Sequence, residues 1–129
     1  MDVLLDTNVF LWIISDDARL SDRARNVFLN EDNRLLFSIA GLWEIIIKLR
    51  SGKLTVKTDN PAAFFKSQLQ ENAISIKGIT LEHVAGTLDL PMIHKDPFDR
   101  LIIAQALHDR LPVLSSNPVF AEYGVTNLF

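Results

Sequence analysis

The sequence contains no cysteine among its 129 residues. This excludes disulfide bonds, zinc sites built from thiolates and cysteine nucleophiles, and it suits a reducing compartment. The chain also lacks any apolar run near the roughly 18 residues that a membrane span needs. No basic region followed by a long apolar segment stands at its start, so we expect no signal peptide. These absences predict a cytoplasmic protein with no membrane partner.

Two signatures of phosphate binding are absent as well. No Gly-x-Gly-x-x-Gly motif follows the first apolar segment, which disfavours a dinucleotide-binding fold. The formal net charge of −3 argues against a broad surface for nucleic-acid phosphates, although not against a local one. The chain shows no internal repeat and no low-complexity tract. Its length and its 48% hydrophobic content predict one domain spanning residues 1–129.

What the sequence does contain is an alternation of short apolar strands and helices. We expect strands at residues 3–5, 35–38, 74–76 and 113–114, with a last edge strand at 125–128. Helical patterns fall between them, and the pattern at residues 39–50 is apolar on almost every side, which predicts a deeply placed helix. This alternation predicts an α/β fold, a three-layer α/β/α architecture with a mostly parallel central sheet.

Polar residues follow the first and fourth predicted strands. Asp6, Thr7 and Asn8 end the first strand, and Ser115 and Asn117 follow the fourth. Open α/β sheets bind their ligands at these carboxyl ends. Asp6 fits a turn or cap residue, but a carboxylate between apolar runs is costly unless it is paired or bound to a metal. We therefore favour a functional role for Asp6.

The densest polar signal is the segment that opens the helix at residues 97–110. Pro97 suits the first turn of a helix, and Asp96 suits the N-cap position before it. Asp99 falls one turn further, close to Asp96. Capping and compensation of the helix dipole would by themselves explain both acids. For His94, just upstream, we favour a hydrogen bond within the loop over a role in phosphate binding.

Glu44 is the acid whose role the pattern leaves most open. It lies four residues before Lys48, the spacing of an ion pair on a helix surface. It also lies within an apolar helix, where a carboxylate needs a partner and a cation in the cleft is one candidate. The sequence alone does not decide between a surface ion pair with Lys48 and a site in the cleft.

In a parallel α/β fold these acids would meet in one cleft. Carboxylates gathered without a matching cluster of lysines or arginines cannot all remain ionised without a cation. Oxygen ligands without cysteine or a histidine cluster favour Mg²⁺ or Mn²⁺. Such a cation would orient a water and stabilise charge on phosphate oxygens, which points to hydrolysis of a phosphodiester.

Three motifs carry a resemblance to a known family. They are Leu5-Asp6-Thr7-Asn8; Leu42-Trp43-Glu44-Ile45 with Lys48 and Gly52-Lys53-Leu54; and the run from Asp96-Pro97-Phe98-Asp99-Arg100 to Ala106. Together with Tyr123-Gly124-Val125 they make the chain similar to PIN-domain nucleases, and within them to the VapC-type toxins of bacterial toxin–antitoxin pairs. The resemblance implies a PIN-like fold and a Mg²⁺- or Mn²⁺-dependent endoribonuclease that acts on RNA.

The same resemblance implies roles for individual residues and for partners. Asp6, Glu44, Asp96 and Asp99 correspond to the catalytic acids, with Asp6, Asp96 and Asp99 as metal ligands. Thr7, Asn8, Ser115 and Asn117 would support the site, and Lys48 and Arg100 are candidates for substrate binding. It further implies a homodimer and a cognate antitoxin that inserts a segment into the cleft.

One position departs from the family pattern, and it keeps alternatives open. The family usually has an aspartate shortly after the fourth strand, where this chain has Asn117. An amide oxygen can still bind a metal or its water, but it brings no charge, so a second metal should bind more weakly. A catalytically weakened RNA-binding or regulatory protein is therefore an alternative. A phosphohydrolase with Asp6 as nucleophile is another, although Asn8 stands where such enzymes generally have a second acid.

Overall fold

The computed structural model describes all 129 residues, which form a four-stranded parallel sheet covered by helices. The strands are β1 (Asp2–Leu5), β2 (Arg34–Ser38), β3 (Ile74–Lys77) and β4 (Val113–Leu114). Their order across the sheet is β3-β2-β1-β4, and every neighbouring pair is parallel. The expected three-layer α/β/α architecture with a parallel sheet is confirmed.

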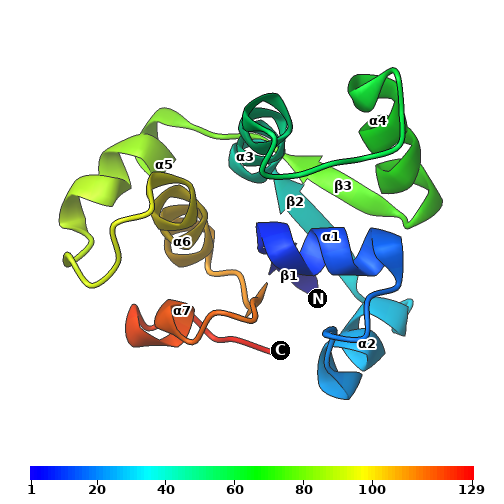
Figure 1. The fold of residues 1–129 in the computed structure, drawn as a ribbon. Coiled ribbons are helices and arrows are strands. Elements are labelled where there is room, and N and C mark those ends of the chain that lie inside the picture. The colour runs from blue at the N-terminus through cyan, green and yellow to red at the C-terminus, as the bar shows by residue number, and fades with distance from the viewer.

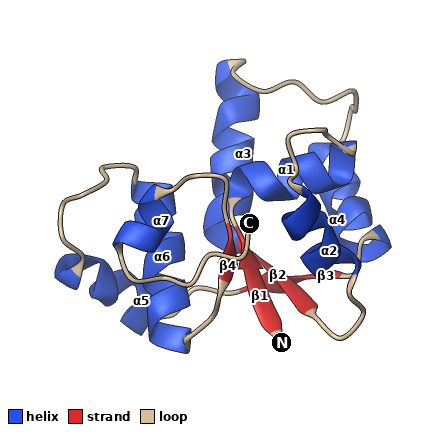
Figure 2. Cartoon of the chain, turned by 90° about the horizontal axis from the view of Figure 1, so that it is seen from below, coloured by secondary structure: helices blue, strands red, loops and turns tan.

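The helices lie in two groups on the two faces of the sheet (Figures 1 and 2). One face is covered by α1 (Thr7–Ser15), α2 (Asp22–Leu29) and α4 (Pro61–Glu71). The other is covered by α6 (Pro97–Asp109) and α7 (Val119–Glu122), while α5 (Leu81–Gly86) packs on α6 and leads into a 3₁₀ turn at Thr87–Asp89. The remaining helix, α3 (Ile39–Ser51), starts directly at the end of β2. None of the helices combines the length and the apolar character needed to cross a membrane.

Alternation along the strands builds a separate core on each face. In β1, Val3 and Leu5 join the core under α1, α2 and α4, whereas Leu4 joins the core under α6 and α7. All three side chains are fully buried. Because a slip of one residue would exchange the two faces, this packing fixes the strand register and with it the position of Asp6.

Helix α3 is less deeply buried than its sequence predicted. Only one stripe of it is buried, formed by Ala40, Gly41, Glu44 and Ile45. On the other side Trp43 is 61% exposed, and Ile46 and Ile47 are exposed as well. The helix packs against α1, α6 and β2 through one side, so these three side chains on its other side remain largely exposed to solvent. Glu44 nevertheless lies on the buried stripe.

Close packing at Gly41 brings α3 near the end of β1. A Cβ atom at this position would lie 2.5 Å from the Phe37 ring and 3.2 Å from the Thr7 hydroxyl. Phe37 is itself stacked on Phe10, with ring centroids 4.2 Å apart. The absence of a side chain at Gly41 therefore lets α3 carry Glu44 to the residues that follow β1.

The expected edge strand at residues 125–128 is wrong. This segment makes only an isolated parallel bridge between Val113 and Asn127. Beyond this bridge the contact with the chain after β4 is made by the side chain of Asn127. It accepts a hydrogen bond from the Ser115 N–H and donates one to the Ser115 carbonyl. The segment thus runs beside the two-residue strand β4 without forming a strand, held by two backbone hydrogen bonds to Val113 and by the side chain of Asn127.

Candidate active site

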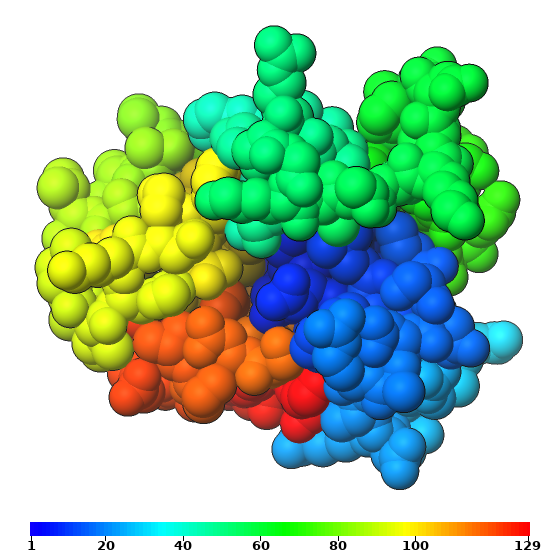
Figure 3. All heavy atoms as spheres, viewed as in Figure 1, coloured from blue at the N-terminus to red at the C-terminus, as the bar shows by residue number.

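A wholly polar pocket of about 170 Å³ opens at the carboxyl ends of β1 and β4. In the space-filling view, a hollow lies where dark-blue, green, yellow and orange segments meet (Figure 3). Eight residues line the pocket: Asp6, Thr7, Asn8, Glu44, Lys48, Asp96, Asp99 and Asn117. The structure therefore brings together all four predicted acids and four of the six other predicted site residues.

Asp6 is held firmly between strand and helix. It caps α1, with one carboxylate oxygen accepting the Val9 N–H at 2.7 Å, while the other accepts the Ser115 hydroxyl at 2.5 Å. Burial raises the pKa of Asp6 to about 6, the two hydrogen bonds oppose the rise, and the charges of Asp99 and Glu44 add to it. Asp6 is thus both a cap and a charged group that its surroundings disfavour.

Asp96 and Asp99 open α6 as the sequence predicted. One oxygen of Asp96 accepts the Asp99 N–H at 2.8 Å, and Pro97 occupies the first helical turn. Burial raises the pKa of Asp99, and the charges of Asp96 and Glu44 contribute, whereas a hydrogen bond from His94 opposes the rise. Capping engages only one oxygen of Asp96, so this residue can cap the helix and still offer an oxygen to the pocket.

Glu44 belongs to the pocket and to an ion pair at once. Its Oε1 atom accepts the Thr7 hydroxyl at 2.6 Å, and its Oε2 atom lies 3.0 Å from Lys48 Nζ. Glu44 is only 7% exposed. The two interpretations that the sequence left open are therefore combined, because the expected pair with Lys48 forms at the wall of the pocket.

Ser115 and Asn117 extend the site from the end of β4. The Ser115 hydroxyl donates to Asp6 and accepts the Asn117 N–H at 3.0 Å, but Ser115 itself does not line the pocket. Asn117 lines the pocket, and its side-chain oxygen accepts the Val119 N–H at 3.0 Å. A chain of hydrogen bonds thus connects the turn before α7 to Asp6.

Arg100 lies outside the pocket, unlike the other predicted site residues apart from Ser115. Its guanidinium donates to four backbone carbonyls, those of Thr87, Leu90, Pro91 and His94, and to the Tyr123 hydroxyl. These bonds brace the loop that precedes α6. The geometry gives Arg100 a structural task, and its contact with substrate stays a prediction.

His94 is a neighbour of the site that the sequence interpretation missed. Its Nε2 atom lies 2.8 Å from Asp99 Oδ2, and its backbone N–H donates to the Tyr123 hydroxyl at 2.8 Å. The expected contact within the loop was therefore replaced by a contact with one of the acids. The position of His94 two residues before Asp96 was a signal, but the path of the loop was needed to read it.

The donor set suits a hydrated hard cation. No group of three or more His, Asp or Glu side chains has the arrangement of a completed metal centre. Mg²⁺ usually retains several waters and binds proteins through one or two carboxylates, so a completed cage is not required. Burial, with a smaller contribution from the neighbouring acids, raises the pKa values of Asp6 and Asp99. Four carboxylates line the pocket and Lys48 is its one basic residue, so the pocket has more negative charge than Lys48 balances. A divalent cation would relieve this excess.

The family model described as PIN domain matches residues 3–125. No curated protein sequence matches the chain. Solved structures with a similar fold include the three that follow.

VapBC2 from Rickettsia felis, bound to a DNA fragment from its promoter, is 16% identical with a TM-score of 0.71, covering 100% of this chain and 98% of that one. A toxin–antitoxin complex from Klebsiella pneumoniae is 18% identical with a TM-score of 0.64, covering 98% of each chain. FitAcB from Neisseria gonorrhoeae is 17% identical with a TM-score of 0.66, covering 100% of this chain and 97% of that one. At identities this low, the structural similarity shows a shared fold alone.

The family match spans nearly the whole chain, from β1 through the segment after α7, and includes every residue of the pocket. It agrees with the motifs at Asp6, Glu44 and Asp96 that suggested the family. The chain belongs to the PIN domain family.

Proposed function

We propose that this protein is a metal-dependent endoribonuclease that hydrolyses RNA phosphodiester bonds as the toxin of a toxin–antitoxin pair. The observation that carries the proposal is the pocket itself. Three separate segments deliver four carboxylates to a cavity of about 170 Å³ that no apolar side chain lines. Membership of the PIN domain family and the fold shared with toxin–antitoxin proteins support it.

Asp6, Asp96 and Asp99 would hold a Mg²⁺ or Mn²⁺ ion. When bound, such an ion makes a water more acidic and stabilises charge on phosphate oxygens. The protein's part is to fix the oxygens in advance. Ser115 and Val9 orient both oxygens of Asp6, and α6 orients Asp96 through its first turn.

Glu44 is the acid best placed to handle a proton. Thr7 donates to one of its oxygens and Lys48 pairs with the other, which fixes the orientation of Glu44. A carboxylate held in the pocket in this way is a candidate general base for a water that attacks the substrate phosphate. Lys48 in turn offers its remaining N–H donors to a phosphate oxygen. Thr7, Asn8 and Ser115 keep supporting roles, and Arg100 acts through the loop that it braces.

The exposed side of α3 supports a homodimer. Trp43, Ile46 and Ile47 lie exposed there, and the Trp43 ring meets Phe98 of α6 edge to face at 5.4 Å. A neighbouring pair of helices that both present apolar side chains is typical of a protein–protein interface. The partner we propose for this surface is a second copy of the chain.

A cognate antitoxin is the second protein partner that we propose. The structures with the same fold include complexes described as toxin–antitoxin pairs. An antitoxin segment that enters the acidic pocket would bring a basic side chain, because the pocket has an excess of carboxylates. Such a pair would act in the cytoplasm.

One observation favours a second candidate, a catalytically weakened PIN protein that binds or regulates RNA. Asn117 brings no charge to the pocket, and its side-chain oxygen is already engaged by the Val119 N–H. Metal titration separates the two functions. A catalytically weakened PIN protein would show no Mn²⁺ binding at millimolar metal, whereas the nuclease requires Mn²⁺ or Mg²⁺ binding.

The direct test is cleavage of RNA by the protein and by Asp96→Asn in Mg²⁺ or Mn²⁺. We expect the variant to fold and to lose cleavage, because it keeps an oxygen for the cap at the Asp99 N–H but loses the charge. Asp32→Asn is the matched control, since Asp32 is exposed and its side chain makes no hydrogen bond. Cleavage by Asp96→Asn at the rate of the unaltered protein would refute the assignment of the site.

A further inference from the structure

The side chain of Asn117 is fixed in one orientation by its neighbours. Its Oδ1 atom accepts the Val119 N–H at 3.0 Å. Because an N–H group needs an acceptor, the oxygen of the amide must face Val119 and the Nδ2 group must point elsewhere. The Asn117 backbone N–H is fixed too, by its hydrogen bond to Ser115 Oγ at 3.0 Å.

The Nδ2 group of Asn117 has both of its hydrogens to offer. It makes no hydrogen bond within the chain, and it is not among the buried atoms that lack a partner, so solvent reaches it. Asn117 is one of the residues that line the acidic pocket. Most other groups there are carboxylate oxygens, which accept hydrogen bonds. Asn117 therefore adds donors to a pocket that is dominated by acceptors.

We propose that Asn117 binds a phosphate oxygen of the RNA through its Nδ2 group and thereby limits the pocket to a single divalent cation. An amide nitrogen with two hydrogens repels a cation and attracts the anionic oxygens of a phosphodiester. This inference rests on the proposed function, and it reverses the expectation that the amide oxygen of Asn117 supports the metal.

Replacement of Asn117 by aspartate isolates this role. Aspartate has the same shape, and one of its oxygens retains the bond to the Val119 N–H. The other oxygen takes the place of Nδ2, so a donor becomes a fifth carboxylate in the pocket. The fold and the hydrogen bond to the Val119 N–H are kept, while a hydrogen-bond donor is replaced by a charged acceptor at one atom. If the role of Asn117 were purely structural, Asn117→Asp would affect metal binding and RNA binding only through its added charge, as a charge-matched variant elsewhere in the pocket does.

The experiment measures Mn²⁺ stoichiometry by calorimetry without RNA, and binding of a short single-stranded RNA in Ca²⁺, where we expect no turnover. For the unaltered protein we expect one Mn²⁺ per chain. For Asn117→Asp we expect a second Mn²⁺ and RNA binding about tenfold weaker, the effect of one hydrogen bond to a charged group. In Mn²⁺ the loss should appear in KM more than in kcat.

Asn8→Asp is the charge-matched control. Asn8 lines the same pocket and makes no side-chain hydrogen bond, so its replacement adds the same charge without changing a fixed donor. We expect it to weaken RNA binding less than Asn117→Asp does and to add no second Mn²⁺. Equal effects of the two variants, or none from Asn117→Asp, would overturn the inference, as would two Mn²⁺ in the unaltered protein. An unaltered protein that binds no Mn²⁺ would refute the proposed function along with it.

Discussion

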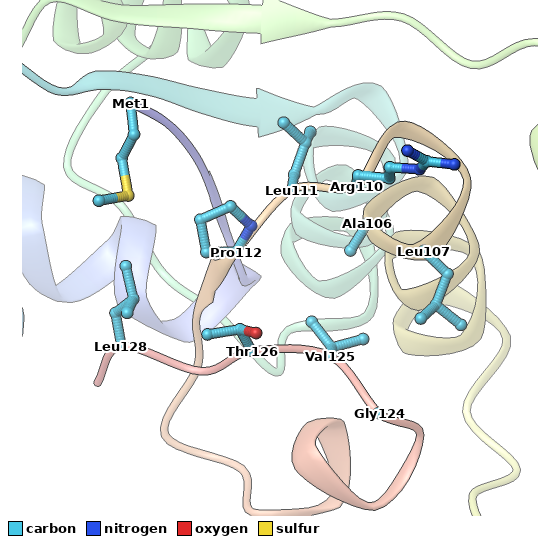
Figure 4. Close-up of a pocket in the computed structure, with 10 residues that line it drawn as sticks. All are labelled: Met1, Ala106, Leu107, Arg110, Leu111, Pro112, Gly124, Val125, Thr126 and Leu128. Carbon is cyan, nitrogen blue, oxygen red and sulfur yellow. The ribbon is translucent and has the colours of Figure 1, made fainter.

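The two ends of the sheet carry pockets of opposite character, although the same strands β1 and β4 lead into both. At the carboxyl ends lies the acidic pocket of about 170 Å³. At the amino ends lies a larger pocket of about 500 Å³, drawn in Figure 4, where α6 ends and the C-terminal segment passes. Its lining is mostly apolar, including Met1, Leu111 and Val125, with Arg110 as its one charged residue.

The two pockets differ in charge as well as in size, and charge rather than size leads us to propose the acidic end as the functional one. The larger pocket is lined mostly by apolar side chains, and its one charged side chain, that of Arg110, is exposed to solvent. The smaller pocket gathers four carboxylates whose mutual repulsion and burial work against folding. A protein keeps such an arrangement where it serves a purpose, and the pKa shifts of Asp6 and Asp99 are its physical signature.

The largest effect that we expect is a loss of cleavage confined to the acidic end. Asp99→Asn should lower kcat/KM for RNA about a thousandfold, equivalent to about 4 kcal/mol of transition-state stabilisation. The amide keeps an oxygen for His94 but loses a charged ligand. Thr126→Ala at the opposite end should change kcat/KM less than about twofold. Equal losses from the two variants, measured on one RNA substrate, would remove the functional distinction between the ends.

The next effect concerns stability and its dependence on pH in the absence of metal. Because the pKa of Asp6 is raised from 3.8 to about 6, the folded state binds a proton more tightly than the unfolded state. Stability should therefore fall as pH rises from about 4 to about 6, by about 3 kcal/mol. Asp6→Asn removes this penalty and should be the more stable protein above pH 6.

Urea unfolding in EDTA across pH 4 to 8 checks this expectation. Asp2→Asn is the matched control, because Asp2 is an acid of the same strand that lies outside the pocket. If Asp6→Asn were no more stable than the unaltered protein at pH 7, the carboxylate would not be strained by its site.

A smaller effect distinguishes the structural role of Arg100 in the loop before α6 from the role of the acidic pocket. Arg100→Lys should lower the free energy of unfolding by about 2 kcal/mol, because an ammonium cannot reproduce the five hydrogen bonds of the guanidinium. KM for RNA should stay within about twofold. The combination of chemical denaturation and steady-state kinetics tests this, and a large rise in KM with unchanged stability would restore Arg100 as a substrate contact.

The smallest effect lies at the apolar end. Arg110 ends α6 with a φ of 56° and a ψ of 48°, in the left-handed region that favours glycine. Arg110→Gly should therefore raise the free energy of unfolding by about 1 kcal/mol and leave RNA cleavage unchanged. The thermal midpoint and the cleavage rate measured together check it. A variant that is less stable would show that the Arg110 side chain contributes to the lining of this pocket.

The sequence predicted the parts of the fold that local chemistry determines. Apolar runs marked β1 and β2, and Asp96-Pro97 marked the start of α6, because capping and strand burial depend on neighbours in the chain. The rule that parallel strands gather their carboxyl ends then placed Asp6 beside Asn117. For these reasons the membership of the acidic pocket was largely predictable.

The errors concern side chains whose environment depends on distant contacts. The all-round apolar pattern of α3 does not reveal that one side lacks a partner, so the exposure of Trp43 was missed. After a single bridge to Val113, the side chain of Asn127 rather than a further strand residue binds Ser115, which no propensity indicates. The path of the loop before α6 directs Arg100 to carbonyls and His94 to Asp99. The orientation of the Asn117 amide is likewise a tertiary property.

The central claim is that the acidic pocket holds a divalent cation, and calorimetric titration with Mn²⁺ tests it most directly. We expect saturable binding to the unaltered protein, a large loss of affinity in Asp6→Asn and Asp96→Asn, and full affinity in Asp32→Asn. No binding by the unaltered protein at millimolar Mn²⁺, or unchanged binding by the two pocket variants, would contradict it.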